Sequence, residues 1–338
     1  MQTSDTAWFP AHFMKGMTYA GFSPDVFLSP ESDQSLEALR HTNSNWVAVA
    51  VGWWQDRKDS IVIQPNPDKT PTDASLVHVI RSLGQKGVKV LLKPFVDAVD
   101  HSWRAEFRPT DWDSWFASYK AFMLHYAKIA AAENVALLSI GVENYLGPDP
   151  TQAHWQELIA EVRAIYAGPL THSANFNGET GYDQVRFWDQ LDYIGIDAYF
   201  STHSGNDHSL SCQLNNWQKH LREIQKWRQA QQLRQAVLFT EIGICSYKSA
   251  AATPWQEKIH DPADGNAQAR YYQAFFEAAR DHDWLHGSFW WWWDNPSTAD
   301  YIHADGTYAN LWTPKGKPAE TVLKLYYGLP AQVSESAK

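Results

Sequence analysis

The sequence predicts an α/β protein in which the 338 residues form one (β/α)8 barrel, a TIM barrel, with the barrel itself over about residues 14–327. Short apolar runs alternate with longer segments of helical period, which is typical of parallel strands joined by crossover helices. No Gly/Ser-rich, Pro-rich or like-charge stretch is long enough for a linker, so we expect a single domain over residues 1–338. The first strand–helix turn, TYAGFS at residues 18–23, is not the G-x-G-x-x-G of a doubly wound sheet, which favours the barrel.

Eight segments are dense in β-branched residues, leucine or aromatics, as strands buried on both faces should be. In chain order they are residues 16–20, 46–52, 88–95, 135–143, 169–174, 191–199, 236–243 and 286–293. Eight strands, each followed by a crossover segment, are the number that closes such a barrel.

The segments between these strands carry helix signals. A Ser-Pro-Glu start at residues 29–31 opens the first helix, and a second helix over residues 72–86 ends at Gly87. Apolar residues with a 3.6-residue period predict further helices in 110–133, 151–166, 214–227, 267–280 and 318–327. The link after the fifth strand is short and only weakly helical.

Composition limits the classes of partner. The formal net charge is −10 and the basic residues are scattered, so we expect neither a nucleic-acid partner nor a membrane partner. The 18 tryptophans exceed what a core of this size needs, and flat indoles stack on the C–H faces of sugar rings. We therefore expect a neutral carbohydrate ligand and a monomeric protein.

No pattern predicts a metal or a cofactor. The 14 histidines form no H-E-x-x-H pair, and Cys212 and Cys245 lack a second pair of cysteines. A G-x-S-x-G elbow and a Gly-rich phosphate loop are also missing. Residues 1–8 have no basic and apolar leader pattern, and no run of ~18 apolar residues occurs. We expect a soluble protein, either cytoplasmic or secreted with its signal removed.

Two predicted strands end in a glutamate: LLSIGVE ends at Glu143 and VLFTE ends at Glu241. Active sites of (β/α)8 barrels lie at the carboxyl ends of the strands. A carboxylate there is costly unless it is paired, hydrogen-bonded or protonated. Strands four and seven face each other across the mouth, which suits a retaining glycosidase with its carboxyls about 5–5.5 Å apart. A structural acid bonded to backbone amides or to an arginine is the alternative for either residue.

Other strand ends carry candidate substrate-binding residues. Lys93 ends a strongly apolar strand, and we interpret it as substrate-facing, with an ion pair to Asp97 or another acid as the alternative. Trp53 follows the second strand as a candidate sugar platform. Alternation along the last strand lets only about half of its four consecutive tryptophans face the cleft, and we favour Trp291 and Trp293. Core packing is the alternative for each tryptophan.

Three segments resemble glycoside hydrolase family 113, within the clan of retaining (β/α)8 glycosidases. They are VKVLLKPF at residues 88–95, LDYIGIDAY at 191–199 and GSFWWWW at 287–293. The resemblance, which spans about residues 14–327, implies endo-β-1,4-mannanase activity on mannan, glucomannan or manno-oligosaccharides, with no cofactor. It also implies that Glu143 is the general acid/base and Glu241 the nucleophile of a double displacement.

The resemblance to the clan has one departure. In most of the clan an asparagine that binds the sugar 2-hydroxyl precedes the acid/base, whereas here Val142 precedes Glu143 and Asn144 follows it. We expect Asn175, just past the fifth strand, to replace that donor, and Tyr199, which ends the sixth strand, to hydrogen-bond the nucleophile. Ordinary strand-end and turn chemistry is the alternative for both residues.

Two other kinds of function are compatible with these residues. The same chemistry would serve a β-glucanase, a β-galactanase or an exo-acting β-mannosidase or mannobiohydrolase. A barrel that binds carbohydrate without hydrolysing it is the second alternative, and the presence of both glutamates argues against it.

Overall fold

The fold is a closed barrel of eight parallel strands. The computed structural model describes residues 8–147, 152–205, 207–257, 261–296 and 311–331. Each strand pairs with the next in sequence, and β8 pairs back onto β1. The strands are β1 (Met14–Ala20), β2 (Trp46–Gln55), β3 (Lys89–Ala98), β4 (Leu137–Val142), β5 (Leu170–Asn175), β6 (Tyr193–Asp197), β7 (Ala236–Ile242) and β8 (Leu285–Trp290). The predicted (β/α)8 architecture is confirmed, although β8 ends three residues earlier than expected.

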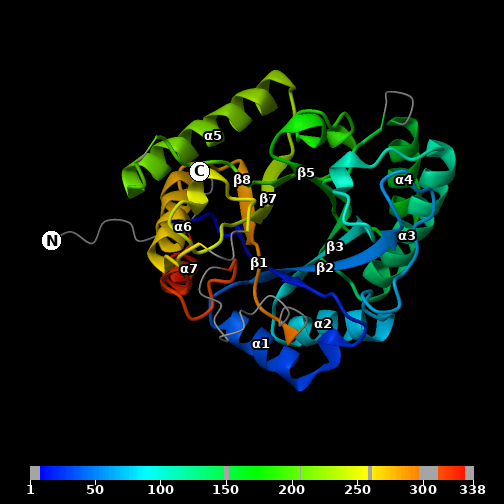
Figure 1. Cartoon of the computed structure of the whole chain (residues 1–338), viewed down its shortest axis with the longest axis horizontal. Helices are drawn as coiled ribbons and strands as arrows, with labels where there is room; N and C mark the ends of the chain where they lie inside the picture. Colours follow the sequence, from blue (N-terminus) through cyan, green and yellow to red (C-terminus); the bar gives the residue numbers. More distant parts are fainter. Residues whose placement is uncertain (1–7, 148–151, 206, 258–260, 297–310, 332–338) are drawn as a thin grey trace, which may run out of the picture.

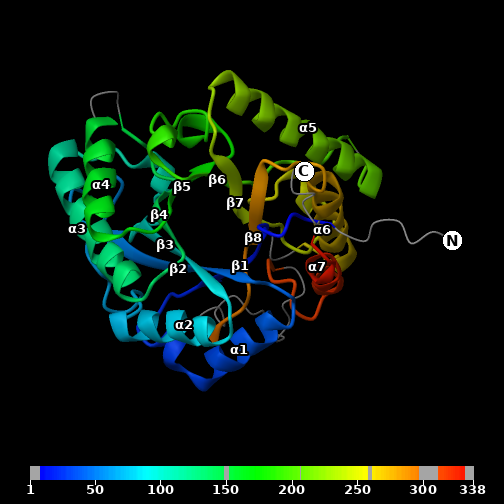
Figure 2. The same cartoon turned by 180° about the vertical axis from the view of Figure 1, so that it is seen from behind.

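The helices of the described ranges surround the barrel, with α1 and α2 on one side, α3 and α4 on a second, and α5, α6 and α7 on a third (Figures 1 and 2). They are α1 (Pro30–Arg40), α2 (Asp73–Gln85), α3 (Trp112–Ala132), α4 (Gln152–Ile165), α5 (Leu210–Ala230), α6 (Gly265–Ala279) and α7 (Pro318–Gly328). None of these described helices is long and apolar enough to cross a membrane.

The helix signals in the sequence correspond to real caps. The Ser29 hydroxyl accepts a hydrogen bond from the amide of Ser32 at the start of α1, as predicted from the Ser-Pro-Glu run. After α2 the chain turns at Gly87, whose φ of +72° is the left-handed conformation that favours glycine. The weakly helical link after β5 forms only the short 3-10 helices Gly178–Thr180 and Trp188–Gln190.

The interior of the barrel changes from apolar to polar toward the carboxyl ends of the strands. Its lower part is filled by Met14, Trp46, Ala48, Leu91, Leu137, Leu238 and Phe289, with Ala20, Ala50, Phe95 and Val142 in a smaller group nearer the mouth. Across β5, β6 and β7, Asn175 lies opposite Asp197, and Asp197 lies opposite Glu241. The strand register thus places a row of polar residues at the mouth.

Candidate active site

The two strand-end glutamates border one cavity. Glu143 directly follows β4 and Glu241 is the second-to-last residue of β7, so both lie at the carboxyl end of the barrel. The cavity has a volume of about 430 Å³. Its other lining residues in the described part of the chain are Trp103, Arg104, Asn175, Phe176, Asn177, Tyr199, Trp255, Glu257, Trp291, Trp292 and Trp312. The lining therefore combines a few acids with many indole rings, as carbohydrate sites do.

A tight turn at the end of β4 presents Glu143. Its φ of +52° is in the left-handed region, which is uncommon for a residue with a Cβ, and its amide donates to the carbonyl of Ser173 at 2.7 Å. The side-chain oxygen of Asn144 accepts from the amide of Val142 at 3.0 Å and from the hydroxyl of Tyr119 at 3.2 Å. Asn144 is thus buried in the turn that directs Glu143 into the cavity.

The surroundings of Glu143 favour its protonated form. Burial raises the pKa of this carboxyl, and the nearby negative charge of Glu241 raises it further. The guanidinium of Arg104, the ammonium of Lys93 and a hydrogen bond from Trp103 lower the pKa, without cancelling the net upward direction. A carboxyl with a raised pKa is suited to donate a proton near neutral pH.

Glu241 is held by two donors at once. Lys93 Nζ donates to Oε1 at 2.5 Å, and the Tyr199 hydroxyl donates to Oε2 at 2.6 Å. Burial and the carboxylate of Glu241 raise the pKa of Tyr199 well above its usual range, so the phenol stays a donor. A cation and a hydroxyl thus bind the two oxygens of Glu241 and fix their orientation.

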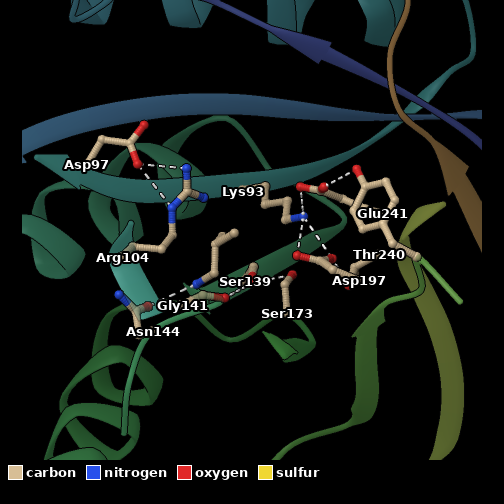
Figure 3. A network of polar contacts seen from close by, with 12 residues as sticks. Lys93, Asp97, Arg104, Ser139, Gly141, Asn144, Ser173, Asp197, Thr240 and Glu241 are labelled. Carbon is tan, nitrogen blue, oxygen red and sulfur yellow. Dashed lines mark hydrogen bonds and ion pairs between the residues drawn. The ribbon is translucent and has the colours of Figure 1, made fainter. Parts of the chain in front are cut away.

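Lys93 also pairs with Asp197, and its ammonium lies between the two carboxylates (Figure 3). Its distances to the two Asp197 oxygens are 3.0 and 3.2 Å. Burial alone would lower the pKa of Lys93, but Asp197 and Glu241 together hold it above the ordinary value. Thr240 donates to Asp197 at 2.8 Å and completes this buried group.

Arg104 forms a second ion pair at the mouth. Its Nε and Nη2 donate to Asp97 Oδ1 at 3.0 and 2.7 Å (Figure 3). Its guanidinium lies 4.9 Å from the ring centre of Phe95. Burial opposes the charge, whereas Asp97, Glu143 and Glu241 favour it, so the pKa of Arg104 is raised overall. The cavity therefore has a fixed positive charge on the side of Glu143.

The sequence model of Glycoside Hydrolase Family 113 matches residues 17–315, which is most of the chain. The chain belongs to glycoside hydrolase family 113. It is a glycoside hydrolase, and the resemblance noted in three sequence segments is confirmed. A search of curated proteins found no match.

Solved structures of family 113 have the same fold. The structure of a GH113 β-1,4-mannanase matches with a TM-score of 0.80 and 30% identity, covering 94% of this chain and 99% of that one. The β-mannanase of Alicyclobacillus acidocaldarius in complex with ManMIm matches with a TM-score of 0.80 and 28% identity, covering 94% and 97%. A β-glucuronidase of Ruminococcus gnavus, at 14% identity, a TM-score of 0.61, and 93% and 50% coverage, shares the fold alone.

Five of the predicted site residues of this family 113 enzyme border the cavity: Glu143, Glu241, Asn175, Tyr199 and Trp291. The expected hydrogen bond from Tyr199 to Glu241 is present at 2.6 Å. Asn175 also lies at the cavity, where its amide nitrogen donates to Thr180 at 2.9 Å. The contacts of these residues with sugar stay predictions.

Three other predicted binding residues do not border the cavity. Lys93 is only 1% exposed and makes the ion pairs that the alternative interpretation described, although with Asp197 and Glu241 and not with Asp97. Trp53 points out of the barrel and packs on α3, with its ring 5.4 Å from that of His125. The prediction that Lys93 and Trp53 face the substrate is therefore wrong.

The prediction that Trp293 faces the cleft is also wrong. It is fully buried, and its indole nitrogen donates to the carbonyl of Ser35 in α1 at 3.0 Å. β8 ends at Trp290, so the alternation that favoured Trp293 does not extend that far, and Trp292 lines the cavity beside Trp291. The peptide bond between Trp291 and Trp292 is cis.

Several residues of the cavity were missed because they lie in loops, where no periodicity fixes the direction of a side chain. Trp103 and Arg104 follow β3, and Trp255 and Glu257 follow β7. Trp103 is 52% and Trp255 46% exposed, which is unusual for tryptophan, and the indole of Trp312 donates to Glu257. Tryptophans in the loops after the strands are the signal that would have found them.

In the part of the chain that the structure describes, no group of three or more His, Cys, Asp or Glu side chains is placed to hold a metal ion. Cys212 and Cys245 are both free thiols and buried. The absence of a metal and of a cofactor remains a prediction from the sequence.

Proposed function

We propose that this family 113 glycoside hydrolase is an endo-acting β-1,4-mannanase that works with retention of configuration. In this mechanism Glu143 is the general acid/base and Glu241 the nucleophile. Mannan, glucomannan and manno-oligosaccharides are the proposed substrates. The β-1,4-mannanases named above, at 28–30% identity over 94% of the chain, support this choice of sugar.

The observation that carries the mechanism is the contrast between two glutamates of one cavity. Glu241 has an ammonium on one oxygen and a phenol on the other, and these two donors orient it. Burial raises the pKa of Glu143, which favours the acid. An oriented carboxyl group beside one that is suited to donate a proton is what a double displacement requires.

The proposed reaction has two steps. Glu241 attacks the anomeric carbon while Glu143 gives its proton to the departing glycosidic oxygen, which leaves a glycosyl-enzyme. Glu143, now a carboxylate, then takes a proton from water as the water attacks, and the bonding pair returns to Glu241. The indoles of Trp291, Trp292 and Trp255 line the cavity and are positioned to stack on sugar rings.

The test is turnover of β-mannan by the wild type, Glu143→Gln and Glu241→Gln, with the anomer released from mannotetraose followed by NMR. We expect each variant to lose at least about 1,000-fold in kcat/KM, and the β-anomer to appear first. Glu161→Gln, a half-exposed α4 residue paired with Lys120, is the control and should keep full activity. Near-normal activity in either catalytic variant would remove that residue from its role.

Product sizes separate the alternatives. An endo-acting enzyme releases a range of oligosaccharides from mannan, whereas release of only mannose or mannobiose would indicate an exo-acting enzyme. Activity confined to β-glucan or β-galactan would contradict the choice of sugar. Binding of mannotetraose by calorimetry, with no reducing ends released, would indicate a barrel that binds without hydrolysis.

A further inference from the structure

A buried polar group lies directly beneath the proposed nucleophile. Lys93, Asp197 and Thr240 come from β3, β6 and β7 and are each no more than 1% exposed. Of the linked group formed by these three residues and Glu241, only Glu241 borders the cavity: Lys93 donates to Glu241 and to Asp197, and Thr240 donates to Asp197. Any effect of these three residues on a bound sugar must therefore pass through Glu241 (Figure 3).

The strand register places two acidic side chains opposite each other, and Lys93 contacts both of them. Asp197 and Glu241 are direct partners across β6 and β7, and like charges placed opposite each other destabilise a sheet. The ammonium of Lys93 reaches both carboxylates from β3, which pairs with β2 and β4 and with neither of these two strands. One ammonium thus bridges two facing acids from across the barrel, and burial and the charge of Glu241 still raise the pKa of Asp197 well above its usual value.

The donors of Lys93 are fully used. An ammonium has three N–H groups. Its three hydrogen bonds are to Asp197 Oδ1, Asp197 Oδ2 and Glu241 Oε1, at 3.0, 3.2 and 2.5 Å. Two acceptors on Asp197 fix the direction of the ammonium, which leaves the shortest contact for Glu241 and no donor for a sugar hydroxyl.

We propose that Lys93 and Asp197 are positioning residues for the nucleophile: Asp197 anchors the ammonium, and the ammonium holds the carboxylate of Glu241 in one orientation. This inference rests on the proposed function. In the first step the ammonium keeps Glu241 available to form the bond to the anomeric carbon. In the second step, when that bond breaks, its electron pair returns to Glu241, and the same ammonium stabilises the charge.

A purely structural role predicts a different result. If Lys93 served only to neutralise the buried Asp197, removing both charges together would restore stability and activity alike. If Lys93 positions Glu241, removing both charges restores stability alone. The double variant Lys93→Met/Asp197→Asn separates these two explanations, because it keeps the side-chain volumes and leaves no unpaired aspartate.

The experiment measures kcat, KM and Tm on mannotetraose for the wild type, Lys93→Met, Asp197→Asn and the double variant. We expect kcat to fall at least about 100-fold in Lys93→Met and about 10-fold or more in Asp197→Asn, with KM changed less than threefold. The double variant should recover most of the Tm lost by Lys93→Met while its kcat stays at least about 100-fold down. Recovery of kcat to within about threefold of the wild type would overturn the proposal.

The split between kcat and KM provides a readout that a structural role would not change. Loss of stability lowers kcat and Tm together, whereas loss of an oriented nucleophile lowers kcat while KM stays near the wild-type value and Tm is recovered. A kcat that follows Tm across the four proteins would contradict the proposal. Since the double variant balances its charges, this measurement remains possible if Lys93→Met alone fails to fold.

Two controls complete the design. Lys15→Met removes a half-buried lysine near the start of β1, which donates to the carbonyl of Tyr327, and should leave kcat unchanged. Glu241→Gln separates this inference from the proposed function. Loss of activity in Glu241→Gln together with normal kcat in the Lys93 variants would refute the positioning role alone. Full turnover by Glu241→Gln would refute the proposed function itself.

Discussion

Tyr199→Phe removes one oxygen atom and one hydrogen bond from the proposed active site. The phenol donates to Glu241 Oε2 at 2.6 Å in a buried contact, and its ring lies 5.6 Å from that of Trp312, a contact that phenylalanine keeps. A buried hydrogen bond to a charged group contributes about 1.5–3 kcal/mol. If this energy is lost in the transition state, kcat/KM falls by about 10- to 150-fold.

The assay is steady-state hydrolysis of mannotetraose by Tyr199→Phe and by Tyr271→Phe as a matched control. Tyr271 is fully buried, and its hydroxyl has no hydrogen-bond partner among the described residues, so its removal should leave kcat/KM unchanged. Because Lys93 still contacts the other oxygen of Glu241, activity should persist at a reduced level. A loss smaller than about threefold in Tyr199→Phe, or equal losses in both variants, would refute the reasoning.

Three further predictions follow from the same contacts. Arg104→Met removes a cation that lowers the pKa of the acid/base carboxyl of Glu143, so the basic limb of the kcat/KM profile should move to higher pH. Asp97→Asn removes the counter-ion of that arginine and should move the same limb to lower pH. Movement of the limb in the same direction in both variants would contradict this account. Burial lowers the pKa of His172 from 6.5 to about 3. Between these two pH values the unfolded state therefore binds more protons than the folded state. The free energy of unfolding should fall by roughly 1.4 kcal/mol per pH unit as the pH drops through this window. His172→Phe should flatten that slope in urea titrations, and an unchanged slope would exclude this histidine as its source. Trp291→Ala should raise KM for mannotetraose by up to about tenfold, whereas Trp53→Ala should lower Tm and leave KM unchanged; the reverse pattern would contradict the placement of these rings.

The fold could be predicted from the sequence because its signals are local. Buried parallel strands need continuous apolar runs, and the crossover helices need apolar residues with a 3.6-residue period. Both patterns can be recognised within a short stretch of sequence. Caps such as Ser29 and Gly87 depend only on their immediate neighbours. The end of β8 could not be predicted, because four successive tryptophans satisfy the composition of a strand whether or not the backbone stays extended.

The site could be predicted only where strand position decides it. A glutamate at the carboxyl end of a barrel strand must face the mouth or its rim, and this argument located Glu143 and Glu241. The partner of Lys93 could not be predicted, because Asp197 lies 104 residues away and meets it only across the closed barrel. Trp53 was predictable in principle: Ala48 and Ala50 point inward on β2, so odd-numbered residues there point outward.

Each proposed catalytic acid has a cation near it at the mouth of the barrel. Both cations are residues of β3 or of the loop that follows it. Lys93 contacts Glu241 directly and is anchored by Asp197, whereas Arg104 donates to Asp97 and affects Glu143 through its charge alone. A direct ammonium contact fixes the orientation of Glu241, while a guanidinium already engaged by an aspartate leaves the second carboxyl free to gain and lose a proton. Buried ion pairs are weak contributors to stability, since desolvation offsets most of their attraction. The polar layer at this end of an otherwise apolar barrel is therefore better explained by its effect on these two carboxyl groups than by any contribution to folding.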